Sequence, residues 1–529
     1  MKKIYPIDIA GIKKIGIEKW LKDCYIPVTG EEYQTIYDGV FASFLDAIKP
    51  YNNDVVYWLA ISNIKTISII SVWISQVLRS IRLRERGYEY IVGNEKITIP
   101  NDLSMFKYNS LSNINLIGMI VSRLNFQERI KNALRTVKYN IFPPVFANKD
   151  FITNISSPIF FIGHRSQQEV VAYCNQNKIT PIHISPLLFA SSSSEKVKND
   201  SELNDLHRFI YNFHMLLKKQ FPEISNSTFE LLKNELDECF FYSLIIFRQN
   251  VNAIRRIESK KLLVTGLGAI VTRIFCASWR YAGGEVTGFL HGNGFAYGYS
   301  PRTSIVSLSL VDHYVTVSAG HKEVLQKVAE DFSYGLRMGN ITFAKQSYYK
   351  RLFAKLQKEK SANKIRKIML VGCPLKEGYS PFFPNYYVFT QFDLEVKLIK
   401  LLRSSGFYVI YKPHPLTIDD VEGIYSEYAD EVLTSRFEEV YDKADCIMFG
   451  NYATTTFGFS LHTNKPIVFF AVKGDYWYPR VFELVKKRCS VVEAKAVDGR
   501  IVFNEQDVLN AIESSIENID YEILHELAF

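Results

Sequence analysis

The stretch "FYVIYKPHPL" (residues 407–416) indicates how the C-terminal half of the chain folds. Its first five residues are aromatic or β-branched and predict a buried strand. Pro413 and Pro415 each remove a backbone donor and fix φ, so the strand must end before them. Lys412 and His414 then lie at the carboxyl end of the strand. In open parallel α/β sheets this is the edge where ligands bind.

Strands and helices alternate on both sides of this stretch. Short apolar runs are separated by segments with helical periodicity, and such alternation is typical of a parallel sheet with helices on its faces. The predicted strands of the C-terminal half are residues 367–372, 407–412, 446–450 and 465–470.

The N-terminal half shows a similar alternation around a long helical region, residues 202–258. Its predicted strands are residues 160–163, 261–266, 285–292 and 313–318. A polar segment, residues 333–365, separates the two halves. We therefore predict an α/β protein with two Rossmann-like, doubly wound domains facing a cleft, with extra N-terminal helices. Residues 1–345 are assigned to the N-terminal domain, with helical insertions, and residues 346–529 to the C-terminal domain.

Composition and charge exclude several classes of protein. Of the 529 residues, 47% are hydrophobic and 22% charged, which is ordinary for a globular protein. The net charge of +8 favours an anionic ligand or an anionic membrane surface, but it is weaker than the clustered basic stripe of a nucleic-acid-binding protein. The seven cysteines never form a CxxC pair, which argues for a reducing compartment and against a metal site.

The N-terminal sequence lacks the apolar core and cleavage site of a secretory signal. The most apolar early stretch, residues 57–78, contains Asn63 and Lys65 and predicts a buried or interfacial helix rather than a membrane span. We therefore expect a cytoplasmic protein, with peripheral contact at the inner face of the cell membrane as a further expectation.

A second group of polar residues follows the next predicted strand, 446–450. Residues 451–456 join it to a helix, and such a turn exposes backbone N–H groups that suit an anion. Thr454, Thr455 and Thr456 supply helix caps and hydroxyl donors for a phosphate oxygen, while Lys412 and His414 approach from a neighbouring strand. The alternative is that Thr454 only caps its helix and His414 only packs.

These two motifs resemble those of a known group of enzymes. "KPHP" (412–415) followed by "ADCIMFGNYATTTFGFSLHTNKPIVFF" (444–470) is similar to the C-terminal half of bacterial surface-polysaccharide transferases of the GT-B fold. The resemblance covers roughly residues 366–475. It includes CDP-glycerol glycerophosphotransferases, and also sialyltransferases and Kdo transferases, which pair an HP motif with a Ser/Thr-rich motif to hold CMP.

The resemblance implies roles for individual residues. His414 would contact the donor phosphate, and the same pocket would be lined by Tyr452, Thr454, Thr455 and Thr456. This chain has "NYATTT" where the glycerophosphotransferases have an Asp-Tyr-Ser-Ser segment, which weighs against CDP-glycerol as the donor. Lys376, in the loop after the first strand of this half, is a further candidate for the donor phosphate, although a surface lysine is the default interpretation.

The N-terminal half carries the candidate catalytic residues. His291 ends a predicted strand and opens the glycine-rich loop "HGNGFAYG" (291–298), which resembles the catalytic His-Gly loop of the glycerophosphotransferases. A neutral histidine there would take the proton of an acceptor hydroxyl. Glu285 is a second candidate base, unless it only begins its strand in solvent. His164, Arg165 and Asn293 are candidate acceptor-binding residues.

The predicted function is therefore that of a metal-independent glycosyltransferase with no cofactor besides its nucleotide-sugar substrate. The favoured donor is a CMP-linked ulosonic or nonulosonic acid, and the acceptor is a cell-surface glycan or lipid-linked glycan. A CDP-glycerol glycerophosphotransferase and a UDP- or GDP-sugar transferase remain as alternatives. A non-catalytic scaffold of a polysaccharide assembly complex is the alternative from another class.

Overall fold

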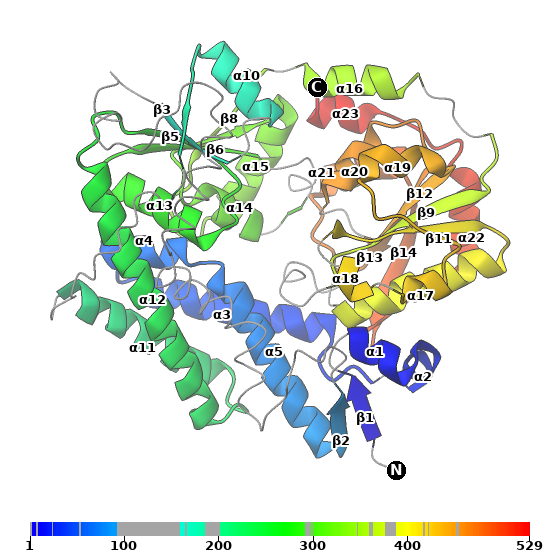
Figure 1. Cartoon of the computed structure of the whole chain (residues 1–529), viewed down its shortest axis with the longest axis horizontal. Helices are drawn as coiled ribbons and strands as arrows, with labels where there is room; N and C mark the ends of the chain where they lie inside the picture. The colour runs from blue at the N-terminus through cyan, green and yellow to red at the C-terminus, as the bar shows by residue number, and fades with distance from the viewer. Residues whose placement is uncertain are drawn as a thin grey trace.

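A computed structural model of the chain describes most of its residues outside one long segment. The described residues are 3–6, 9–23, 25–51, 54–91, 159–163, 167–184, 186, 201–290, 298–299, 301–345, 347–358, 363–375, 388–415, 418–421, 423–450 and 454–529. Within them two parallel sheets lie side by side, and helices surround both (Figure 1).

The C-terminal unit is built on a seven-stranded sheet in the order β11-β10-β9-β12-β13-β14-β15. All its pairs are parallel except β14 with β15. The chain runs outward from β9 to β11 and then returns to the other side of β9 with β12, so the strand order reverses between β9 and β12. The strands are β9 (Lys367–Val371), β10 (Tyr408–Lys412), β11 (Glu431–Val432), β12 (Cys446–Phe449), β13 (Ile467–Val472), β14 (Ser490–Val497) and β15 (Arg500–Val502).

Helices cover both faces of this sheet, as the buried runs of its strands require. The long helix α17 packs on one face, and α19 and α20 pack on the other together with α21. The helices are α17 (Val388–Ser404), α18 (Ile418–Val421), α19 (Phe437–Val440), α20 (Thr455–Leu461), α21 (Pro479–Arg488), α22 (Glu505–Ser514) and α23 (Glu522–Leu527), with short 3₁₀ turns η5 (Tyr425–Glu427) and η6 (Tyr441–Lys443).

The N-terminal unit has a six-stranded, fully parallel sheet in the order β4-β3-β5-β6-β7-β8. Its strand order reverses between β3 and β5. Gly163, just after β3, has φ +119°, and a Cβ there would lie 1.9 Å from the hydroxyl oxygen of Thr265 at the end of β5, so only glycine fits. The elements are β3 (Ile159–Ile162), α10 (Gln168–Gln176), β4 (Ile182–His183), β5 (Lys261–Thr265), α13 (Ile270–Tyr281), β6 (Glu285–Phe289), α14 (Pro301–Leu308), β7 (His313–Thr316), α15 (Ala319–Asp331) and β8 (Asn340–Phe343).

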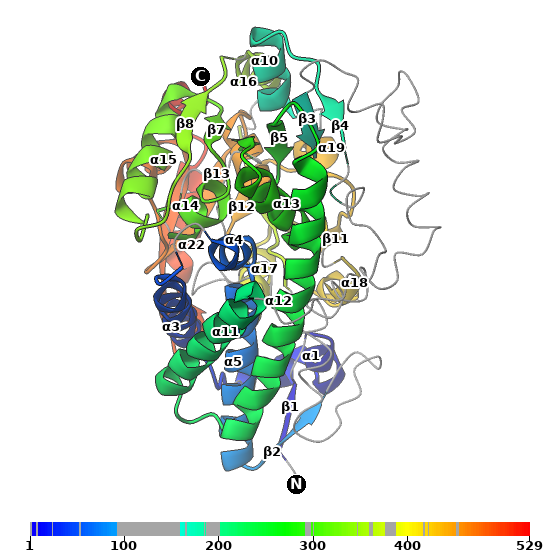
Figure 2. The same cartoon turned by 90° about the vertical axis from the view of Figure 1, so that its left-hand side faces the viewer.

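A layer of helices packs against α13 on the outside of this sheet (Figure 2). Its members are α3 (Gly30–Ile48), α4 (Val55–Ser62), α5 (Thr66–Glu85), α11 (Ser201–Gln220) and α12 (Asn226–Ile254). The fully buried guanidinium of Arg273 joins α13 to this layer, because it donates to the carbonyl oxygens of Ile61 and Ser62 at the end of α4, at 2.8 and 3.0 Å. The last carbonyls of a helix have no i+4 partner within it, and the guanidinium supplies donors to two of them.

The apolar stretch of residues 57–78 is part of this layer. It forms most of α4 and α5, which meet at a 60° bend over Asn63–Lys65. Both helices are largely buried inside the protein. Among the described residues no single helix has the length and hydropathy needed to cross a membrane. Helices α4 and α5 have that length and hydropathy only when the two are counted together.

The first residues of the chain lie on the C-terminal unit. They form β1 (Lys3–Pro6), α1 (Ile9–Ile15) and α2 (Ile17–Asp23), and β1 pairs with β2 (Tyr88–Ile91). Trp20 is 3% exposed, and its ring lies 5.4 Å from that of Phe392 in α17. The predicted division at residue 345 falls where the two sheets separate, but assigning all of residues 1–345 to one domain does not describe this contact.

Two further elements join the units. Helix α16 (Tyr348–Leu356) connects β8 to β9, and α23 at the end of the chain packs on α15, where the hydroxyl of Ser318 donates to the carbonyl oxygen of Leu527 at 2.6 Å. In addition, Gly298 and Trp477 form an isolated antiparallel bridge. The α/β class with two Rossmann-like units and extra N-terminal helices, the GT-B-type architecture expected from the sequence, is confirmed.

Candidate functional site

Lys412 and His414 lie together at the carboxyl edge of the C-terminal sheet. Lys412 is the last residue of β10 and is only 3% exposed. Its ammonium donates to the carbonyl oxygen of Pro413 at 3.0 Å, and within the described residues it forms no ion pair. His414 follows two residues later and is half-buried. A buried cation whose partner in the described part of the chain is a neutral carbonyl is costly, so this edge suits an anion.

The electrostatics of this pair show the same deficit of negative charge. Burial lowers the pKa of Lys412, and the nearest acidic influence comes from the exposed Glu438 on α19. Burial also lowers the pKa of His414, and the adjacent Lys412 cation lowers it further. The His414 imidazole is therefore neutral at pH 7 and can donate one N–H to a ligand. A bound phosphate would reverse both effects.

Thr454, Thr455 and Thr456 lie at the start of α20, on the same face of the sheet as Lys412. Ile410, two residues before Lys412, packs with Phe457 of α20 in one hydrophobic cluster. Since β10 and β12 are separated only by β9, the two strand ends lie about 10 Å apart. The hydroxyl oxygen of Thr454 accepts from the backbone N–H of Phe457 at 3.1 Å, so its capping role is observed.

Several predicted site residues lie outside the described part of the chain. These are the donor-site candidates Lys376 and Tyr452, the candidate base His291 and the acceptor-site candidates His164, Arg165 and Asn293. The residue before His291, Leu290, is 2% exposed, and its carbonyl oxygen accepts a hydrogen bond from the Gln167 side chain. Gln167 therefore ties the start of α10 to the end of β6, where the chain reaches His291.

Glu285 is not at this edge. It is the first residue of β6, and its carboxylate lies 3.6 Å from the imidazole of His313, the first residue of β7. Both therefore sit at the amino edge of the parallel sheet, whereas His291 follows its carboxyl edge. Four residues of strand, about 13 Å, separate the two ends. The structure thus supports the alternative in which Glu285 begins its strand near solvent, and we do not propose it as the base.

A buried carboxyl group beneath the site was not predicted. Glu395 lies in the middle of α17, is 1% exposed and accepts four hydrogen bonds. The signal in the sequence is that Glu395 lies three residues after Phe392 and four before Ile399 in "FDLEVKLIKLL" (392–402), on the apolar face of the predicted helix. The strand ends that surround Glu395, however, could only be found from the fold.

Within the described residues, no group of three or more His, Cys, Asp or Glu side chains is arranged to hold a metal ion. Six of the seven cysteines lie in the described part of the chain, and all six are buried and outside any disulfide. Burial raises the pKa of Cys446, on β12, to about 12. This thiol is protonated at neutral pH and is therefore a poor nucleophile.

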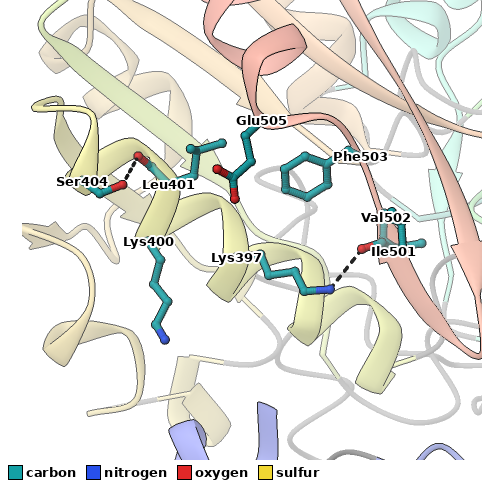
Figure 3. A pocket seen from close by; sticks show the side chains of 8 residues that line it. All are labelled: Lys397, Lys400, Leu401, Ser404, Ile501, Val502, Phe503 and Glu505. Carbon is teal, nitrogen blue, oxygen red and sulfur yellow. Dashed lines mark hydrogen bonds between the residues drawn. The ribbon is translucent and has the colours of Figure 1, made fainter. Parts of the chain in front are cut away.

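A surface pocket of about 440 Å³ lies elsewhere on the C-terminal unit, between α17, β15 and the start of α22 (Figure 3). Two lysines line it, but both have partners: Lys397 with Asp393 and the carbonyl oxygen of Ile501, and Lys400 with Glu18. The pocket follows the second half of α17, which runs away from the carboxyl edge of the sheet. It is therefore separate from the Lys412 site.

Comparisons with known proteins show no family for this chain. No family model matches the chain, and no match was found among curated proteins. One similar solved structure is that of a UDP-N-acetylglucosamine 2-epimerase from Rickettsia bellii, at 13% sequence identity and a TM-score of 0.32. The alignment covers 53% of this chain and 71% of the epimerase. At this TM-score the likeness carries no conclusion about activity.

Proposed function

We propose that this chain is a transferase that uses a nucleotide-activated donor, and that Lys412 and His414 hold the donor phosphate. The observation that carries the proposal is the buried Lys412 ammonium, which has no carboxylate partner within the described residues. A phosphate oxygen would supply the missing negative charge, and His414 and the Thr455 and Thr456 hydroxyls would add hydrogen bonds. The position agrees with the rule that α/β sheets bind ligands at the carboxyl ends of their strands.

The favoured reaction is glycosyl transfer from a CMP-linked ulosonic or nonulosonic acid to a glycan or lipid-linked glycan. The acceptor hydroxyl forms the new bond to the anomeric carbon as the bond from that carbon to the nucleotide phosphate breaks. His291 receives the hydroxyl proton, and Lys412 stabilises the phosphate charge of the leaving nucleotide. This assignment of donor rests on the motif resemblance. CDP-glycerol and UDP- or GDP-sugars are the other donors to be compared.

Isothermal titration calorimetry with CMP, CDP, UDP and GDP tests the proposal. We expect one nucleotide to bind, and Lys412→Met to weaken it by about 10–100-fold, because a charge-assisted contact contributes about 1.5–3 kcal/mol. Since the pKa of His414 is lowered in the free protein and a bound phosphate would raise it, binding should also take up protons at this imidazole, which shows as a dependence of the measured heat on the buffer.

Lys465→Met is the matched control. Lys465 is also buried, at 7% exposed, but it precedes β13 at the opposite edge of the same sheet and donates to the carbonyl oxygens of Asp442 and Ala444. Its loss should lower stability without changing nucleotide affinity. Absence of binding for all four nucleotides, or equal affinity in Lys412→Met and the wild type, would contradict the proposed function. Binding without turnover on membrane glycan extracts would favour the scaffold alternative.

A further inference from the structure

The Glu395 carboxyl group lies against the carboxyl ends of β9 and β10 in the C-terminal sheet. One oxygen accepts from the phenol hydroxyls of Tyr411 and Tyr425, at 2.8 and 2.7 Å. The other accepts from the backbone N–H of Cys373 at 2.8 Å and from the Gln391 amide at 3.3 Å. These four donors come from four separate places, namely β10, η5, the turn after β9, and α17 itself.

The same cluster fixes the ends of the central strands against one another. The backbone N–H of Gly372 donates to the carbonyl oxygen of Lys412 at 2.9 Å. A Cβ at Gly372 would lie 2.2 Å from the Tyr411 hydroxyl oxygen, so only glycine fits. A Cβ at Gly450, after β12, would lie 3.1 Å from the Gln391 amide nitrogen. The cluster therefore touches the carboxyl ends of β9, β10 and β12.

A carboxyl group is not what packing alone would place here. The neighbouring positions of α17 that face the sheet are apolar, among them Phe392 and Ile399. No cation lies among the four donors, so across the described residues the group is desolvated without an ion pair, which is usually less stable than an apolar side chain of the same size. Its four hydrogen bonds satisfy every acceptor position of a carboxylate. What they accomplish is to hold the β9 turn and the β10 end as one rigid piece.

We propose that Glu395 is a positioning residue for the donor site, which fixes Lys412 and His414 for a nucleotide phosphate through Tyr411 and the turn at Gly372–Cys373. Tyr411 directly precedes Lys412, and alternation along the strand directs the two side chains to opposite faces. The hydrogen bond from Tyr411 to Glu395, on the side of the sheet covered by α17, thereby sets the position of the Lys412 ammonium on the opposite side. This inference rests on the proposed function, because it assigns a role within the same site.

The test compares two buried acids on one helix. Asp393, two residues before Glu395, is 0% exposed, but it pairs with Lys397 and Arg500 on the outer side of α17. We expect Glu395→Gln to raise the dissociation constant for the bound nucleotide (CMP, CDP, UDP or GDP) about tenfold or more. Asp393→Asn should leave it within about twofold of the wild-type value, because its partners Lys397 and Arg500 belong to α17 and β15 rather than to β9 or β10.

Tyr425→Phe is the second variant, and it removes a single donor without touching the helix, so folding is preserved. Its expected effect on the dissociation constant is several-fold, in the same direction as that of Glu395→Gln. Unfolding in urea, followed for all variants, separates affinity from stability. If the three variants lose stability but bind as the wild type does, the positioning role is refuted and the cluster is only structural. If the wild type binds no nucleotide, the proposed function fails and this inference with it.

Discussion

Each unit of this protein buries one glutamate on the first helix after the first strand of its sheet. The two carboxyl groups differ in where their hydrogen-bond partners lie. Glu395, on the helix after β9, is bound entirely within the C-terminal unit. Glu169, on the helix after β3, is 3% exposed and accepts from the hydroxyl of Tyr349 in the connecting helix α16, at 2.9 Å. Glu395 thus holds the ends of β9 and β10 together, whereas Glu169 connects the N-terminal sheet to helix α16, which joins the two units.

The joint continues from Tyr349 into the C-terminal unit. The Tyr349 ring lies 5.5 Å from that of His462, which directly follows α20. Burial lowers the pKa of His462 to about 4, so this imidazole is neutral and its Nδ1–H donates to the carbonyl oxygen of Gly458. Matching positions in two similar folds thus serve different ends, which shows that topology alone does not assign a role to a buried acid.

The largest difference between the two glutamates is expected in stability. Glu395→Ala removes the partner of three buried donors outside its own helix, the Cys373 N–H and the two tyrosine hydroxyls, and should cost about 3–5 kcal/mol. Glu169→Ala leaves the Tyr349 hydroxyl without its acceptor and removes a hydrogen bond with the Gln167 side chain, and should cost about 1–3 kcal/mol. Urea unfolding measures both. Equal losses would contradict the view that Glu395 has the larger structural role.

The pH dependence of stability is a smaller effect, because only a proton is involved. Burial raises the pKa of Glu169 and of Glu395. An acid whose pKa is higher in the folded state stabilises that state fully below the unfolded value, near 4.3, and this contribution is lost as pH rises through the folded value. The free energy of unfolding should therefore fall less steeply with rising pH in Glu169→Gln than in the wild type. Parallel curves from pH 4 to 8 would contradict the raised pKa.

A still smaller effect on stability is expected for a variant that tests whether the contact between the units influences the nucleotide site. Tyr349→Phe deletes the hydrogen bond to Glu169 and should lower the free energy of unfolding by about 1 kcal/mol. Nucleotide affinity should stay at the wild-type level, in contrast to Tyr425→Phe, because Tyr349 is not one of the four donors to Glu395. Calorimetry on the two phenylalanine variants side by side provides the measurement, and a matching loss of affinity in both would remove the contrast.

The smallest effect is expected at the surface of the C-terminal unit. Lys400 pairs with Glu18 of α2 across the contact made by the N-terminal residues, and both side chains are more than a third exposed. Solvent screens such a pair, so Lys400→Ala should change the free energy of unfolding by only a few tenths of a kcal/mol. A loss of more than 1 kcal/mol would show that this ion pair, rather than the packing of Trp20 on α17, attaches α2.

The sequence predicted the parallel strands well, because their apolar runs are short and end in glycine, proline or polar residues. It did not predict β14 and β15, although "AVDGRIV" (496–502) carries the Asp-Gly pair typical of a tight hairpin. In the structure Asp498 and Gly499 both have positive φ, at 49° and 76°. The region 202–258, predicted as helical throughout, is two helices broken near Pro222. The polar segment 333–365 contains β8 and α16.

The residues of the candidate site that lie at strand ends were predicted from the sequence. The residue that contacts them from the helix side of the sheet, Glu395, was missed. Lys412 and His414 follow from two prolines after an apolar run, a local signal. The position of Glu285 at the opposite edge from His291 follows from strand direction and could have been inferred. The contacts of Glu395 could not, because they join residues from four segments that only the order of the strands brings together.

The two ends of the chain cross over, since α1 and α2 lie on the C-terminal unit while α23 packs on α15 of the N-terminal one. A fragment ending at residue 345 would expose Trp20 to water, and the complementary fragment would expose Leu527. Neither half is therefore a natural unit for separate expression. Mixed together, however, the two pieces present matching apolar surfaces, so this protein is suited to reconstitution from a chain cut between its sheets.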